Sequence, residues 1–119
     1  MSTPPTAPPT DAERELADLV QIGRRLAEEL ETLQRYDAHH ADNAATKTAE
    51  VVHLAKALAA LPADASAYVV ADAKRAVTAA ELQRDRALEE RANLQPELAE
   101  TPKLIAQNKK AIAAARAES

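Results

Sequence analysis

Apolar residues recur along most of the chain at spacings of three and four residues, which is typical of a helix that packs against another helix. From Leu16 to Leu61 the pattern fits one uninterrupted heptad. Its positions are Leu16, Gly23, Leu30, Asp37, Ala44, Val51 and Leu58 at a, and Leu19, Leu26, Leu33, His40, Lys47, Leu54 and Leu61 at d. Thr10 and Glu13 have the spacing of a capping box, and no Gly or Pro follows Gly23 before Pro62. We therefore expect a helix over 11–61.

A second heptad follows the turn at Pro62, where Asp64 or Ser66 can cap the next helix. Its positions are Val70, Val77, Arg84, Arg91, Leu98, Ile105 and Ile112 at a, and Ala73, Ala80, Ala87, Leu94, Thr101, Asn108 and Ala115 at d. Pro96 and Pro102 interrupt this pattern, because proline lacks the amide donor of a helix and clashes with the preceding turn. The pattern predicts helices over 65–94 and 102–117, with a kinked turn between them.

A tight reversal at Pro62 brings the two heptads face to face. Leu54 then lies opposite Val77, and Leu26 lies opposite Ile105. The acidic start of the first helix also faces the basic end of the second, which favours this pairing modestly. We expect an all-α fold: a long antiparallel helical hairpin, coiled-coil-like, with a proline-kinked C-terminal helix.

The middle of the hairpin carries polar residues at seam positions. These interaction candidates are Asp37, His40, Lys47, Arg84 and Arg91. Like charges are too costly in a dry layer, so this region must be hydrated, locally broken or satisfied by acids from another chain. Poor helix formers around 37–46 allow a break in the first helix. The alternative fold is then a compact four-helix bundle, with helices near 11–38, 43–61, 65–94 and 102–117.

Composition indicates a thin core and a single domain. The chain has 119 residues, 46% of them hydrophobic, with no Phe, Trp or Cys. Alanine dominates the apolar set, and alanine favours helix but buries little surface. We expect residues 11–119 to form one helical domain that completes its burial against another chain, and residues 1–10, with four prolines, to form a flexible arm.

Charge and hydropathy argue against two kinds of partner, nucleic acid and the membrane. The net charge of −4 argues against nucleic acid, which binds basic surfaces. No run reaches the ~18 to 20 apolar residues that span a bilayer, and no secretory signal pattern is present, so we expect no membrane association. The predicted location is the cytoplasm, or a virion assembled there.

Metal-ligand side chains are few and incomplete. Glu50 and His53 match the Glu-x-x-His element of di-iron carboxylate bundles, but a full site needs a second copy of it. His39 and Asp42 lie one helical turn apart and are further weak candidates. Solvated or interfacial side chains explain these residues better, so we predict no metal and no cofactor.

No catalytic motif is present, since Gly23 is the only glycine and no nucleophile stands in a recognisable constellation. The leading hypothesis is a non-enzymatic structural or adaptor protein that self-associates, as a homo-oligomer, or packs against the helices of a partner in a larger assembly. A phage or secretion-machine component is an example. Two alternatives are a small ferritin-like metal-binding bundle that uses Glu50 and His53 across a dimer, and an inhibitor or regulator that binds a protein through the polar middle.

Overall fold

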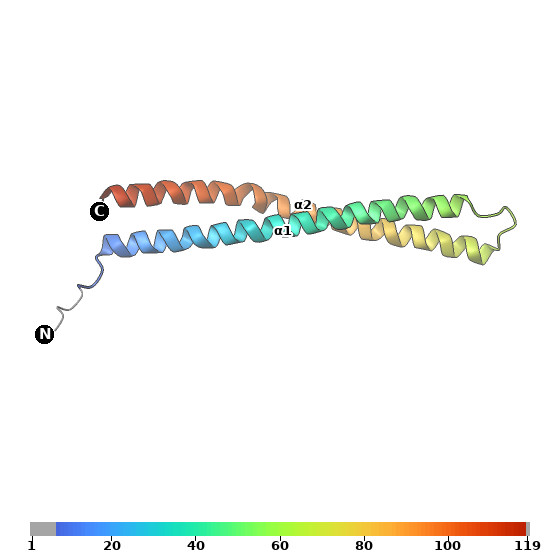
Figure 1. The fold of residues 1–119 in the computed structure, drawn as a ribbon, viewed down its shortest axis with the longest axis horizontal. Coiled ribbons are helices and arrows are strands. Elements are labelled where there is room, and N and C mark those ends of the chain that lie inside the picture. The colour runs from blue at the N-terminus through green and yellow to red at the C-terminus, as the bar shows by residue number, and fades with distance from the viewer. Residues whose placement is uncertain (1–6, 119) are drawn as a thin grey trace. The chain divides into compact units, whose positions relative to one another are not determined.

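The computed structural model describes residues 7–118, which form two long α-helices joined by a short turn (Figure 1). Helix α1 spans Asp11–Ala59, with 49 residues, and helix α2 spans Ala67–Glu118, with 52. No strand occurs in this part of the chain. The predicted all-α helical hairpin is therefore confirmed. Residues 7–10 of the predicted arm are exposed and lack regular structure, and the rest of that arm lies outside the described residues.

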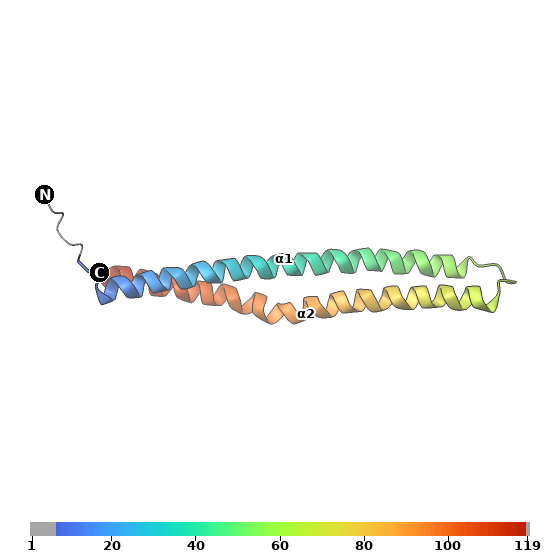
Figure 2. The same cartoon turned by 90° about the horizontal axis from the view of Figure 1, so that it is seen from below.

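The two helices form two compact units. Unit 1 takes in the described residues of Met1–Thr32 and Glu97–Ser119, and unit 2 is Leu33–Pro96. Within each unit, a segment of α1 lies beside a segment of α2, as Figures 1 and 2 both show. Each unit is thus an antiparallel pair of helices with a single packed seam.

Side-chain caps begin both helices. Thr10 Oγ1 accepts a hydrogen bond from the amide of Glu13, at 3.1 Å, and Ser66 Oγ accepts one from the amide of Val69, at 3.2 Å. Each bond satisfies one of the amides that have no partner in the first helical turn. Between the helices, the amide of Ala65 donates to Pro62 O at 3.0 Å and closes the turn. The predicted caps Thr10 and Ser66 therefore set both helix starts.

Helix α1 runs without a break through 37–46. The alternative four-helix bundle, which required a break there, is not formed. Asp37 and His40 are half-buried on the seam and Ala44 is buried, so the packed face continues across this segment. Most helical stability in proteins comes from packing such a face, which outweighs the weak intrinsic propensity of these residues.

Helix α2 also continues through both prolines, so the prediction of separate helices over 65–94 and 102–117 is wrong. The seam positions around the prolines, Leu94, Leu98 and Ile105, keep the helical spacing and stay half-buried. This burial offsets the cost of a proline in a helix, which is about 3 kcal/mol. Pro96 marks the boundary between the two units on α2.

Burial follows the predicted heptads closely. The buried residues are Leu33, Ala44, Ala80, Ala87, Thr101 and Asn108, and each stands at a predicted a or d position. Every other predicted seam residue is at least half-buried except Arg91, which is exposed. No large side chain among the described residues is fully buried. The core is therefore a thin line along the seam.

Candidate interaction surfaces

The polar middle lies in unit 2, where Asp37 of α1 meets two side chains of α2. Arg91 Nε donates to Asp37 Oδ1 at 3.0 Å, and Gln95 Nε2 donates to the same oxygen at 3.0 Å. Gln95 Nε2 also lies 3.0 Å from Arg91 O, the backbone carbonyl one turn before it. Two donors on one carboxylate oxygen hold the two helices together at this level. Because Arg91 is exposed, this pairing takes place at the surface.

The remaining interaction candidates find acidic partners within unit 2. His40 Nδ1 lies 3.2 Å from Glu90 Oε2, across the seam. Lys47 Nζ pairs with Glu50 Oε2 at 3.0 Å on α1, and Arg84 pairs with the adjacent Asp85 at 3.0 Å on α2. Among the described residues, no buried side-chain nitrogen or oxygen lacks a hydrogen-bond partner. Acids from a second chain are therefore not needed to compensate these charges.

The seam positions of the sequence do not reveal these acidic partners, because the acids stand outside the a and d positions. Glu50 and Glu90 both stand at g positions, which flank the seam. Residues at e and g commonly form ion pairs across a helical interface, as Glu90 does with His40, whereas Glu50 pairs with Lys47 on its own helix. A search of these flanking positions finds both residues, and also Gln95 at an e position. The hydrogen bond from Gln95 to Asp37, however, depends on how closely the two helices approach.

The weak metal candidates do not come together. Glu50 is bound to Lys47, and His53, His39 and Asp42 are exposed on α1. The ring of His39 contacts the ring of His40, with centroids 5.5 Å apart. Across residues 7–118, no three acidic, histidine or cysteine side chains are placed to hold one metal ion. Nor does any helix there have a stretch long and apolar enough to cross a membrane.

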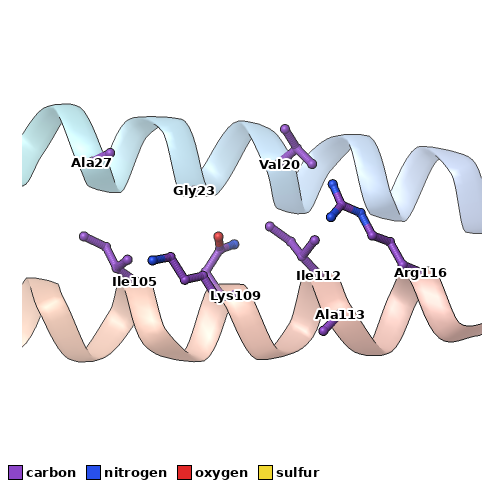
Figure 3. A pocket seen from close by; sticks show the side chains of 9 residues that line it. Val20, Gly23, Ala27, Ile105, Lys109, Ile112, Ala113 and Arg116 are labelled. Carbon is purple, nitrogen blue, oxygen red and sulfur yellow. The ribbon is translucent and has the colours of Figure 1, made fainter.

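A groove opens along the seam of unit 1, with a volume of about 570 Å³. Its α1 side is formed by Val20, Gly23 and Ala27, which are too small to fill the space between the helices. Figure 3 shows Ile105 and Ile112 reaching from α2 toward α1 on either side of Gly23. Lys109 and Arg116 also line the groove. We call this hollow the Gly23 groove: an apolar floor with two basic side chains.

Asn108 fixes the close approach beneath the groove. Its side-chain Nδ2 donates to Leu19 O at 2.8 Å, and the residue is only 8% exposed. A Cβ built on Gly23 would collide with Asn108 Oδ1 and would lie 3.4 Å from Asn108 Cγ. Glycine at this position therefore makes room for the asparagine amide. The heptads place Gly23 opposite Asn108, and that pairing of the only glycine with a polar seam residue was the available signal.

These observations define the class of protein as an antiparallel helical hairpin with a thin seam, a polar middle and one basic groove. Comparison with protein-family models, curated proteins and solved structures finds no match to this chain. The functional assignment therefore rests on the surfaces of the molecule alone.

Proposed function

We propose that this chain is a non-enzymatic structural or adaptor protein, which packs with copies of itself or with partner helices in a larger assembly. The observation that carries this proposal is the thin core. Each unit has two helices and one seam, and most buried positions are alanine or a polar residue. A small core of this kind seldom supplies more than about 3 to 5 kcal/mol, so a further apolar contact would contribute a large share of stability.

Large apolar side chains remain at the surface and support the same proposal. Tyr68, Tyr36 and Leu82 are 74%, 55% and 53% exposed. Val52, Val69 and Leu88 are further exposed residues of unit 2, and Val20, Ile22 and Leu104 are those of unit 1. Burying apolar surface stabilises by roughly 25 cal/mol per Å². A phage or secretion-machine component, in the cytoplasm or in a virion assembled there, is the kind of assembly we have in mind.

The test is the molar mass in solution as a function of concentration. Light scattering coupled to size exclusion, with circular dichroism as the control for helicity, should show a mass above 12.7 kDa that grows with concentration. The melting temperature should rise in parallel, because association stabilises the folded state by mass action. A monomer with a high, concentration-independent melting temperature, which also retains no partner helix from its native source, would overturn the proposal.

A further inference from the structure

A second surface of unit 1 is complementary to the Gly23 groove. Ile22 and Leu104 are 46% and 38% exposed, and both stand at g positions. Ile22 follows Val20 by two residues, which is a rotation of about 200° around the helix. Because Val20 lines the groove, Ile22 projects from a different face of α1. Unit 1 therefore carries apolar side chains on one flank of its seam and an apolar hollow on the other.

The two flanks also differ in charge. The heptad neighbours of Ile22 and Leu104 at c and g positions are mostly acidic and exposed: Glu15, Asp18, Glu29, Glu97 and Glu100, with Arg25 as a base among them. We call this surface the Ile22 edge. The groove is lined by Lys109 and Arg116, within a segment, 103–118, that has four basic residues and one acidic residue. Acidic side chains around an apolar pair thus match basic side chains around an apolar hollow.

We propose that the Gly23 groove of one copy receives the Ile22 edge of a second copy. Ile22 and Leu104 enter the space left by Gly23 and Ala27, and the surrounding carboxylates approach Lys109 and Arg116. The two surfaces are different parts of the same chain, so the contact is heterologous. Each copy keeps a free groove at one side and a free edge at the other. Assembly therefore continues from copy to copy, as a ring or an open chain.

This inference rests on the proposed function and names the partner as the chain itself. Three variants separate the two surfaces. Ala27→Glu places a carboxylate in the groove and leaves the edge intact, whereas Ile22→Gln with Leu104→Gln removes the edge and leaves the groove intact. Glutamine and glutamate are good helix formers, so both variants should keep wild-type circular dichroism. Leu82→Gln is the matched control, since Leu82 is an exposed leucine of unit 2 that belongs to neither surface.

The decisive experiment mixes the two blocked variants. Each alone should remain monomeric at concentrations where the wild type and Leu82→Gln associate. A one-to-one mixture should form a complex of twice the monomer mass and no larger species, because only one groove and one edge remain competent. Isothermal titration of one variant into the other should give the same one-to-one stoichiometry, and added salt should weaken the binding.

Other results would overturn the inference in distinguishable ways. If the wild type associates and both variants still do so, association uses another surface, and the proposed function stands without this interface. If both variants are helical monomers but do not combine, the contact is isologous and not heterologous. A wild type that stays monomeric at every concentration overturns this inference and self-association together.

Discussion

Gly23 and Asn108 form a pair in which the glycine leaves room for the asparagine side chain. A glycine inside a helix costs about 1 kcal/mol relative to alanine, so its presence at a seam position needs a packing reason. The reason is the buried Asn108 amide, which donates to Leu19 O and occupies the volume of a Cβ at position 23. A buried polar residue at a seam position commonly sets the register of paired helices, at some cost in stability.

We predict that the effect of Gly23→Ala changes sign with the residue at position 108. In the wild type, alanine gains about 1 kcal/mol of helix propensity but displaces the Asn108 amide, which costs about 1 to 3 kcal/mol. The substitution should therefore be neutral or destabilising. In an Asn108→Ala background, where the collision is absent, it should stabilise by about 1 kcal/mol. Urea unfolding of the four proteins at one fixed concentration measures this cycle. Additive effects would show that a Cβ at position 23 does not collide with the Asn108 side chain.

The contacts of Asp37 differ from those of Asn108, because they cross the seam but lie at the surface. Asp37→Asn with Arg91→Gln should give an interaction free energy of about 0.2 to 1 kcal/mol in a double-mutant cycle, since exposed ion pairs contribute little. Urea unfolding of the single and double variants is again the measurement. A value above about 2 kcal/mol would indicate that this region is buried, for instance by a second chain in solution.

At the scale of the element, helix α2 is stabilised by packing in spite of its two prolines. Each proline removes one backbone hydrogen bond, the one that the carbonyl of Ala92 or of Leu98 would accept in an unbroken α-helix. The half-buried seam residues on both sides keep the helix continuous. Local sequence rules therefore predicted a break where the packed face continues.

We expect Pro96→Ala to raise the stability of α2, because it restores an amide donor and removes the ring from the preceding turn. The gain should lie between about 1 and 3 kcal/mol, reduced by whatever strain the helix has already relaxed. The matched control is Pro62→Ala, which lies in the turn outside both helices and should change stability by less than about 1 kcal/mol. Thermal and urea unfolding test both. A destabilised Pro96→Ala variant would mean that the proline geometry itself is needed for packing.

At the scale of the whole molecule, pairing of α1 with α2 within each unit makes a prediction about cross-links. Cysteines at Leu26 and Ile105, in unit 1, should form a disulfide within one chain under dilute oxidation, because the predicted register places them face to face. Cysteines at Gln21 and Lys110, at outward f positions of the same unit, are the control and should not join. Cross-linked dimers at Leu26 and Ile105, in place of cross-linked monomers, would show that the hairpins exchange helices between chains.

Some features of this fold depend on residues close together in the sequence, and others depend on packing between distant parts of the chain. Local patterns identified both helices, the caps Thr10 and Ser66, and the seam face of each arm, because side-chain spacing and capping depend on neighbours within a few residues. The same patterns predicted a break at the prolines and left open another at 37–46. Both segments stay helical because packing between distant parts of the chain outweighs weak local propensity.

The sequence by itself determined that this chain forms helices with one apolar face each, and it favoured an antiparallel hairpin over a four-helix bundle. Only the tertiary structure decided where the side chains of the two helices meet. It showed that Asp37 binds Arg91 and Gln95, and that Gly23 accommodates Asn108 beside an open groove. The physical reason is distance along the chain: Asp37 lies 54 and 58 residues from its two partners, and Asn108 lies 89 residues from Leu19, to which it donates beside the groove. Such contacts depend on side-chain shape at the seam.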